Sequence, residues 1–293
     1  MNPLSRREFL KTSLAVGTIA SVGTLPLHAA PRTATDMVTL GKSGMQVTRL
    51  AFGTGSNNGH VQADLGQREF TRLIHYAYDR GIRFFETAEA YATPAMLGEA
   101  LKSFPRDSYQ LMTKVTTDEG VDPQKRFDEM RRTSQTEYFD IMLLHWQHTG
   151  DWVAETGRWQ DGVLEAQAKK IIRTRGASVH GLPALRQMPG NKWLEVAMIR
   201  MNHNGTRMDG PVEDDGNPGN VPEVVQHVKQ VKQQGMGVIS MKLCGDGTFT
   251  RHADRQAAMR FAFKDAGIDC ATVGFKSTQE IDEAIDNMNL ALT

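Results

Sequence analysis

The sequence predicts an α/β fold, a closed (β/α)8 TIM barrel preceded by an N-terminal β-hairpin. Three observations support this prediction. Short apolar segments alternate eight times with segments of helical spacing. The alternation fills about 260 residues, the usual size of such a barrel. The segment that follows Gly81 is largely apolar, as in a parallel strand covered on both faces. A doubly wound sheet also alternates, but the glycine-rich fingerprint typical of its first turn is incomplete at Gly53-Thr54-Gly55.

The expected elements follow in order from residue 37. Two short extended pieces around Gly41-Lys42-Ser43-Gly44 predict the hairpin, and this turn lacks the upstream glycine and long spacing of a phosphate-binding loop. The connection at 202–221 is rich in Asp, Gly and Pro, so it either covers a site or makes an acidic surface excursion. Strands are expected at 50–53, 82–88, 109–115, 140–146, 173–179, 195–201, 237–243 and 271–275. Helices are expected at 67–80, 95–104, 123–136, 161–170, 182–188, 222–234, 253–266 and 278–289.

The N-terminal segment has a different composition from the rest of the chain. A paired Arg6-Arg7 is followed by Phe9-Leu10-Lys11, a weakly apolar run at 12–27 and the small residues Ala29-Ala30. This pattern is similar to a twin-arginine export signal. The paired arginine with its trailing pattern makes a short amphipathic helix the weaker interpretation. A membrane span also fits less well, because the run is short and contains polar residues.

This comparison predicts the domain organisation and the location of the protein. We expect residues 1–30 to be a twin-arginine signal peptide and residues 36–293 to form the barrel. The mature protein would then be periplasmic or otherwise exported by the twin-arginine machinery, with no stable membrane span after processing. Basic and acidic residues number 34 each, so the chain is formally neutral and shows no nucleic-acid footprint.

The two cysteines are expected to remain unpaired. Cys244 comes just after the strand at 237–243, and Cys270 comes just before the strand at 271–275. Adjacent parallel strands would hold them at opposite edges, roughly 15–20 Å apart at about 3.3 Å per residue. A disulfide needs α-carbons within about 7 Å of each other.

Ionisable side chains stand at the ends of three successive predicted strands. Glu86 ends one strand and Tyr91 follows in the loop, while Lys114 and His145 end the next two strands. Each residue alone has an ordinary explanation as a surface lysine, a loop aromatic or a hydrogen-bonded core histidine. Because the carboxyl ends of neighbouring barrel strands converge on one mouth, we expect all four to meet there.

Together these four groups suit the reduction of a carbonyl. The ordinary pKa of a tyrosine is about 10, and a nearby ammonium such as that of Lys114 lowers it. The Glu86 carboxylate would keep that ammonium charged and in place, and His145 would orient the substrate oxygen. Side chains cannot donate a hydride, so this chemistry requires a cofactor.

The same residues resemble the aldo-keto reductase family. The segment Phe84-Phe85-Glu86-Thr87-Ala88-Glu89-Ala90-Tyr91 is similar to the family's Phe-Asp-Thr-Ala-x-x-Tyr motif, and Leu97-Gly98-Glu99-Ala100-Leu101 follows at the expected distance. The resemblance extends from about Val38 to Ile285. Further similar segments are the hairpin at 40–47, the first strand at 50–55, Thr113-Lys114 and the histidine strand at 140–146.

The resemblance implies a small-molecule aldehyde or ketone as substrate and NADP or NAD as cofactor, with no metal. It implies Tyr91 as general acid, Lys114 as its pKa-lowering partner, His145 as orienting residue and Glu86 as the carboxylate beside the lysine. Ser178 would contact the carboxamide, and Lys276 with Ser277 would hold the adenosine-side phosphate. The full set of implied cofactor contacts is Gly53, Ser178, Lys242, Lys276 and Ser277.

Several positions depart from the family pattern. Glu86 replaces an aspartate, and Glu280 replaces an arginine where a carboxylate would repel a 2′-phosphate. The chain ends at Thr293 without the family's long C-terminal substrate loop, which predicts an open site. The remaining departures are Val179 after Ser178, Met198 at a glutamine position and Ser240-Met241-Lys242 where the family has a stacking tyrosine.

Two alternative functions stay open from the sequence. A metal-dependent hydrolase would use His145, His148 and Glu86, although His145-x-x-His148 is a weak metal motif. A barrel that lost turnover would bind a ligand or a partner, as the departures in the cofactor contacts allow.

Overall fold

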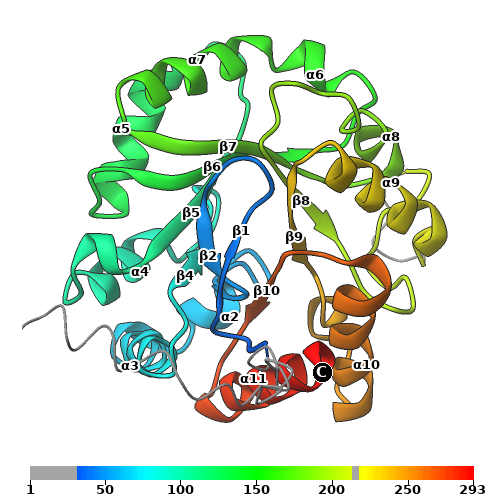
Figure 1. Ribbon diagram of the computed structural model, residues 1–293. Helices are drawn as coiled ribbons and strands as arrows, with labels where there is room; N and C mark the ends of the chain where they lie inside the picture. Colours follow the sequence, from blue (N-terminus) through cyan, green and yellow to red (C-terminus); the bar gives the residue numbers. More distant parts are fainter. Residues whose placement is uncertain (1–31, 213–217) are drawn as a thin grey trace, which may run out of the picture. The chain divides into compact units, whose positions relative to one another are not determined.

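The computed structural model describes residues 32–212 and 218–293. Within them, eight parallel strands close into a barrel in the order β10-β3-β4-β5-β6-β7-β8-β9 (Figure 1). This closed ring confirms the predicted fold class, whereas the predicted signal peptide lies outside the described residues. The barrel strands are β3 (Leu50–Gly53), β4 (Phe84–Glu86), β5 (Gln110–Val115), β6 (Phe139–Gln147), β7 (Ile172–Val179), β8 (Val196–Arg200), β9 (Gly237–Met241) and β10 (Cys270–Gly274).

Helices surround the ring of strands (Figure 1). All eight predicted helices are present, with ends that differ by a few residues, as is usual for fraying helix termini. Two short α-helices and two 3₁₀ turns were not predicted, because a single turn is too short to show a periodic pattern. The α-helices are α2 (His60–Ala63), α3 (Gly66–Asp79), α4 (Pro94–Leu101), α5 (Pro123–Thr133), α6 (Trp152–Glu155), α7 (Gly157–Ala168), α8 (Leu182–Leu185), α9 (Val221–Gln233), α10 (His252–Arg260) and α11 (Thr278–Leu292). The 3₁₀ turns are η1 (Arg106–Ser108) and η2 (Gly245–Gly247), and α10 continues into the π-helical turn η3 (Phe261–Ala266).

The N-terminal hairpin closes one end of the barrel. Its strands β1 (Met37–Thr39) and β2 (Gln46–Thr48) pair antiparallel. Leu40 beside the turn packs with the residues that fill the barrel interior. Gly41 has a φ of +52°, and a Cβ there would lie 2.2 Å from the Gly235 carbonyl oxygen just before β9. The hairpin therefore covers the amino ends of the strands and leaves the carboxyl ends as the mouth.

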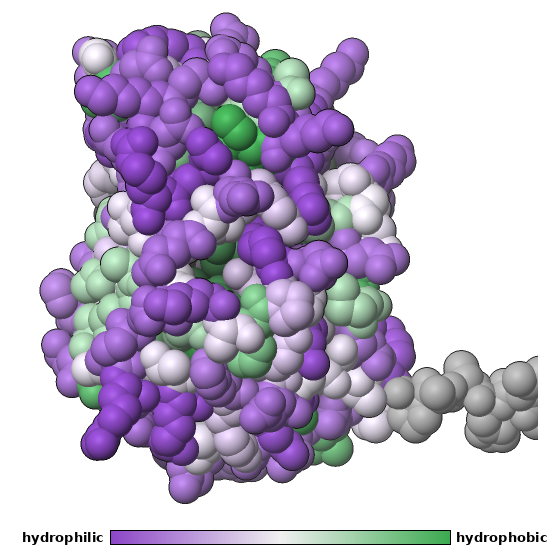
Figure 2. Space-filling model, turned by 90° about the vertical axis from the view of Figure 1, so that its left-hand side faces the viewer, coloured by the Kyte–Doolittle hydropathy of each residue, from purple (hydrophilic) through white to green (hydrophobic). Residues whose placement is uncertain are grey.

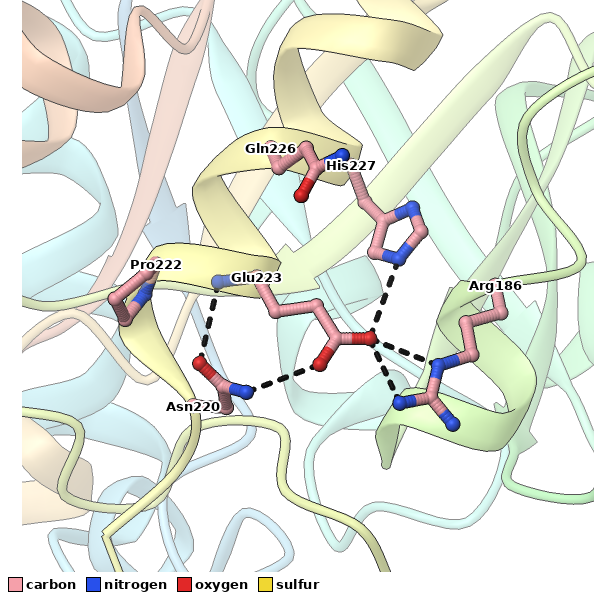
Figure 3. A pocket seen from close by; sticks show the side chains of 6 residues that line it. All are labelled: Arg186, Asn220, Pro222, Glu223, Gln226 and His227. Carbon is pink, nitrogen blue, oxygen red and sulfur yellow. Dashed lines mark hydrogen bonds and ion pairs between the residues drawn. The ribbon is translucent and has the colours of Figure 1, made fainter.

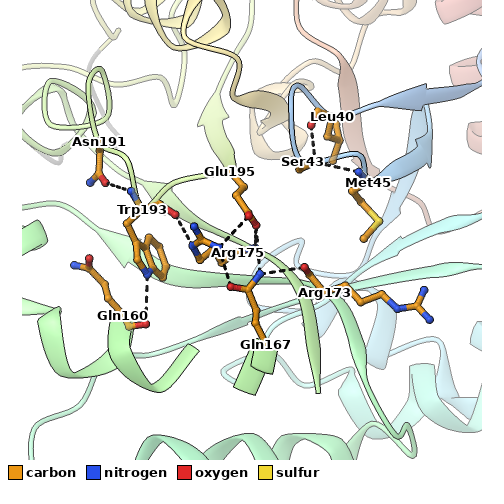
Figure 4. Close-up of polar contacts among 10 residues, drawn as sticks. All are labelled: Leu40, Ser43, Met45, Gln160, Gln167, Arg173, Arg175, Asn191, Trp193 and Glu195. Carbon is orange, nitrogen blue, oxygen red and sulfur yellow. Dashed lines mark hydrogen bonds and ion pairs between the residues drawn. The ribbon is translucent and has the colours of Figure 1, made fainter. Parts of the chain in front are cut away.

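A polar network ties α7, β7 and the start of β8 together (Figure 4). The Arg175 guanidinium donates from Nε to the Trp193 carbonyl at 2.6 Å, and from Nη1 to Gln167 Oε1 at 2.8 Å and Glu195 Oε1 at 2.9 Å. These are charge-assisted bonds on a half-buried side chain, so we assign this network a structural role.

Strand alternation explains how the barrel interior and the outer core are filled. Phe85 points outward and contacts Phe52 and Tyr109, whereas Phe84 packs in the interior with Met112. Burying each such aromatic stabilises the fold by about 1.5–3 kcal/mol. Because side chains alternate along a strand, the residues two positions after Phe84 and Met112 also point inward. Those residues are Glu86 and Lys114, at the mouth.

The long connection between β8 and α9 packs onto the end of β7. Arg200 and Asp209 form an ion pair with 2.7 Å between Nε and Oδ1, and both side chains are fully buried. Asp209 Oδ1 also accepts the Gly181 amide at 2.7 Å, and Gly210 accepts the Leu182 amide at 2.8 Å. The part before residue 213 is thus a packed segment rather than a free surface excursion.

Both cysteines are free in the structure, as expected. Cys270 is buried and Cys244 is partly buried. Burial raises the pKa of the Cys244 thiol to about 11 and the pKa of Cys270 well above its usual range. Both thiols are therefore protonated at neutral pH.

The outer face over α3, α4 and α5 is mainly hydrophilic, with small hydrophobic areas between the polar side chains (Figure 2). This matches helices that bury one face and expose the other. Within the described ranges, no helix has the combination of length and hydropathy needed to cross a bilayer.

Candidate active site

Four of the sequence-predicted residues meet at the mouth of the barrel. The Lys114 Nζ donates to Glu86 Oε1 and to the Thr87 carbonyl, the latter at 3.1 Å, and lies 3.0 Å from the Tyr91 hydroxyl. Lys114 is 1% exposed and Glu86 is 3% exposed. A buried ammonium is therefore neutralised by one carboxylate while it faces one phenol.

The rings of Tyr91 and His145 face each other across the mouth. Their centroids are 5.6 Å apart and their planes are at 82°, an edge-to-face arrangement. Both rings remain partly exposed. A Cβ on Gly55 would lie 2.5 Å from two carbons of the Tyr91 ring, so only glycine at position 55 allows this placement.

A bulge in β6 turns His145 toward Tyr91. The β6–β7 register shifts between Leu144 and Gln147, and Trp146 has a φ of +58°, which is uncommon for a non-glycine residue. The Trp146 amide donates to Ser178 Oγ at 3.1 Å. Ser178 is fully buried, so in this structure its hydroxyl holds the bulge.

The surroundings raise the pKa of Tyr91 and of Lys114 and lower the pKa of His145. Burial raises the pKa of Tyr91, and the Lys114 ammonium opposes that rise. Burial also works against the Lys114 ammonium, but Glu86 and then Tyr91 outweigh it and hold the pKa of Lys114 above its usual value. Burial, with Lys114 and His180 nearby, lowers the pKa of His145 well below its usual value. The predicted influence of Lys114 on Tyr91 is present, but burial outweighs it in the net pKa.

Two predicted cofactor contacts, Gly53 and Lys242, lie at the carboxyl ends of β3 and β9. Gly53 approaches Glu86 closely, because a Cβ there would lie 3.2 Å from Glu86 Oε2 and 2.7 Å from Thr272 Cγ2. Lys242 follows β9 with a φ of +53°, and its Nζ lies 4.0 Å from Asp246 Oδ2.

Lys276 and Ser277 lie at the start of α11, where a nucleotide phosphate is expected. Ser277 Oγ accepts the Glu280 amide at 3.3 Å, and Glu280 Oε2 accepts the Lys276 amide at 2.8 Å. This arrangement is close to a capping box and places a carboxylate at the helix N-terminus. The Lys276 side chain is exposed, and the Glu280 carboxylate lies beside its main chain.

Comparisons with known proteins identify the family of this chain. The profile of the aldo/keto reductase family matches residues 49–286. The chain belongs to the aldo/keto reductase family. A curated relative, probable aldo-keto reductase 1 of Glycine max, is 34% identical over 104 residues, which are 34% of this chain and 29% of that protein. The methylglyoxal reductase DkgA of Escherichia coli O157:H7 is 29% identical over 141 residues, which are 44% of this chain and 50% of that protein. The matches with these two curated relatives thus span half of their length or less.

Solved structures share the fold of this aldo/keto reductase. A putative aldo-keto reductase from Pseudomonas aeruginosa has a TM-score of 0.68 at 19% identity, covering 89% of this chain and 98% of that one. An aldo/keto reductase from Klebsiella pneumoniae, in complex with NADP and acetate, has a TM-score of 0.64 at 17% identity, covering 86% of this chain and 89% of that one.

Three residues shape the site in ways that the sequence alone does not indicate. Gly55 makes room for the Tyr91 ring, Glu89 ties the Tyr91 turn to β5, and His180 lies near enough to lower the pKa of His145. Glu89 belongs to the recognised motif, so its position was visible but its role was not. Nothing in the spacing of Gly55 or His180 indicated their contacts.

Two further polar features of the described residues lie outside this site. Glu223 lies in a hollow beside α8 and α9 (Figure 3). It accepts hydrogen bonds from Arg186 at 2.8 Å and from Asn220 at 3.0 Å, so the polar groups that line this hollow pair with one another. His148 is exposed and its Nδ1 faces the Trp146 carbonyl at 3.1 Å. Within the part of the chain that the structure describes, no cluster of His, Cys, Asp and Glu has the arrangement of a metal site.

Proposed function

We propose that this aldo/keto reductase reduces an aldehyde or ketone by hydride transfer from a nicotinamide cofactor, NADPH or NADH. The observation that carries the proposal is the contact between the Tyr91 hydroxyl and the Lys114 ammonium at 3.0 Å, at a mouth that His145 also faces. A phenol held this way is a proton donor for a carbonyl oxygen. A charge-balanced donor set of this kind favours turnover over the ligand-binding alternative.

The cofactor, when bound, supplies the hydride that the carbonyl carbon accepts. The neutral His145 ring donates one N–H hydrogen bond to the carbonyl oxygen and orients it. As negative charge develops on that oxygen, the Tyr91 hydroxyl gives it a proton, and the resulting phenolate lies beside the Lys114 ammonium. Glu86 keeps this ammonium charged, and solvent returns a proton to Tyr91 afterwards.

The relatives suggest the class of substrate to test first. Proteins named methylglyoxal reductase are among the curated relatives, and the Klebsiella structure contains NADP together with acetate. Small carbonyl compounds are therefore the first candidates as substrate. Purified protein should oxidise NADPH or NADH when methylglyoxal is added and should form the corresponding alcohol. No cofactor oxidation with any member of a panel of small aldehydes and ketones would contradict the proposal.

We also propose that residues 1–30 direct export by the twin-arginine route. The support is the Arg6-Arg7 pair followed by a weakly apolar run and small residues. Replacing both arginines by lysine should leave the protein in the cytoplasm, because the route depends on the pair. The matched control replaces Arg68 and Arg72, two exposed arginines of α3, by lysine. Unchanged export of the Arg6→Lys, Arg7→Lys variant, measured by cell fractionation, would contradict this proposal.

A further inference from the structure

The turn that carries Tyr91 is bound to β5 from both directions. The Glu89 amide donates to the Lys114 carbonyl at 3.0 Å, while the Lys114 side chain donates to the Thr87 carbonyl at 3.1 Å. Each segment thus holds the main chain of the other. The distance between Tyr91 and Lys114 depends on how firmly this turn is held.

The Glu89 carboxylate extends this connection beyond the end of β5. Its Oε1 accepts the Thr116 amide at 2.5 Å, and its Oε2 accepts Arg126 Nη1 at 3.0 Å. The Glu89 side chain is only 10% exposed and the Arg126 side chain 25%. Both carboxylate oxygens are thus paired, and removing Arg126 would leave a largely buried charge without its partner, which costs more than breaking a surface ion pair.

Arg126 lies closer to Glu89 than to the other carboxylates that surround it. Asp118 Oδ2 lies at 3.5 Å and Glu129 Oε2 at 3.9 Å, and both of those side chains are about half exposed. Arg126 is itself fixed on α5, whose first turn is capped by the Asp122 side chain. The guanidinium therefore anchors Glu89 to a rigid element.

Tyr91 follows Glu89 by two residues. Between them Ala90 is exposed, and the Tyr91 amide bonds only within the same turn, to the Ala88 carbonyl at 3.1 Å. We propose that Glu89, held by Arg126, is a positioning residue that fixes the Tyr91 turn against β5 and so sets the contact between Tyr91 and Lys114. The kinetic part of this inference rests on the proposed function, whereas the structural part does not.

Weakening this anchor should slow proton transfer and leave nucleotide binding unchanged. Misplacement by about 1 Å can cost roughly 10²-fold in rate. Lys276 and the start of α11 lie on a different segment, so nucleotide affinity should change less than about twofold. The variants are Glu89→Gln, which keeps an acceptor for the Thr116 amide but loses the ion pair, Arg126→Gln, and the two combined.

The matched control is Glu99→Gln on α4, the helix after Tyr91. Glu99 pairs with Lys102 at 2.8 Å in an exposed ion pair, so its removal tests the loss of a charge alone. Full-length protein is used for kcat, KM, nucleotide affinity and thermal unfolding. The ionisation of Tyr91 is followed by NMR with [13Cζ]tyrosine, and Tyr91→Phe assigns its signal among the 5 tyrosines.

The inference predicts that kcat falls about 10- to 100-fold in both single variants and no further in the double variant, since the two residues act through one bond. The Tyr91 signal should titrate at higher pH in these variants, because a more distant ammonium opposes the effect of burial less. Wild-type kcat and Tyr91 titration in Glu89→Gln and Arg126→Gln would overturn the inference. An equal loss of kcat and nucleotide affinity, with a lower melting temperature, would also overturn it. If the wild type reduces no carbonyl, the proposed function fails, and the Tyr91 titration still decides this inference.

Discussion

The Tyr91 hydroxyl lies 3.0 Å from the Lys114 ammonium nitrogen, and the same ammonium pairs with Glu86. One buried ammonium thus pairs with a carboxylate, which keeps it charged. It also contacts a phenol, whose proton transfer it assists. The phenol in turn faces His145 across the mouth.

Replacing Lys114 by methionine should reduce kcat/KM for carbonyl reduction by ~10²–10⁴-fold. Burial would then raise the pKa of Tyr91 without opposition, and the phenolate formed during reduction would lose its stabilising charge. The change also leaves Glu86 buried without a partner, which costs roughly 3–5 kcal/mol of folding free energy. Adding Glu86→Gln should restore the melting temperature but not the rate. A variant that recovers both would show that Lys114 acts only on stability.

The rate of carbonyl reduction should depend little on pH between about 7 and 9. Reduction needs Tyr91 protonated, and its pKa is raised, so activity should fall only on the alkaline side of the ordinary tyrosine value. His145 has a pKa well below its usual value and stays neutral over this range. The measurement is kcat/KM against pH at saturating cofactor. A loss of activity with rising pH centred near neutral would contradict the role of Tyr91, and a loss with falling pH centred there would contradict the neutral state of His145.

His145 should make the fold less stable in acid. Its pKa is lowered in the folded state, so below about pH 6.5 the unfolded chain takes up a proton that the folded protein does not. The stability from this group is present above that pH and is lost as pH falls. Urea unfolding at pH 7.5 and 5.5 should show a smaller loss in His145→Gln than in the wild type. Equal losses would mean that His145 is protonated in the folded protein.

Glu280 should weaken the binding of NADPH relative to NADH. Its carboxylate lies at the N-terminus of α11 and accepts the Lys276 amide, so it would lie close to a 2′-phosphate. Replacing Glu280 by glutamine should improve NADPH affinity relative to NADH by roughly two- to fivefold, the effect of about 0.3–1 kcal/mol.

The control for this prediction is Asp286→Asn, an exposed residue on the same helix. Lys276→Ala should weaken the binding of both nucleotides if, as we propose, its ammonium contacts a phosphate that NADPH and NADH share. Fluorescence titration gives the affinities. An unchanged ratio in Glu280→Gln would remove Glu280 from the cofactor preference.

The sequence was sufficient to predict the barrel and the group of ionisable residues at its mouth. Glu86 and Lys114 follow interior residues at an even spacing, so strand alternation alone places them inside the mouth. The bulge at Trp146 was not predictable, because it depends on a bond from Ser178 on the neighbouring strand. Arg126 gave no signal, since an arginine on a helix surface is ordinary.

The pKa values could not be predicted either. The sequence suggested that Lys114 lowers the pKa of Tyr91, which is the direction of that single interaction. The net pKa also depends on burial and on Glu86, and burial is the largest of these effects. Its size depends on how closely the Gly55 backbone packs against the Tyr91 ring, a tertiary contact that no sequence spacing encodes.

The most direct measurement compares wild type and Tyr91→Phe in a single-turnover reduction of methylglyoxal, together with titration of the reduced nicotinamide cofactor. Phenylalanine keeps the ring against Gly55 and removes only the proton donor. We expect nucleotide affinity within about twofold of wild type and a rate of hydride transfer lower by ~10²–10⁴-fold. A Tyr91→Phe enzyme that reduces the substrate at the wild-type rate would contradict the role of Tyr91 and the proposed function with it.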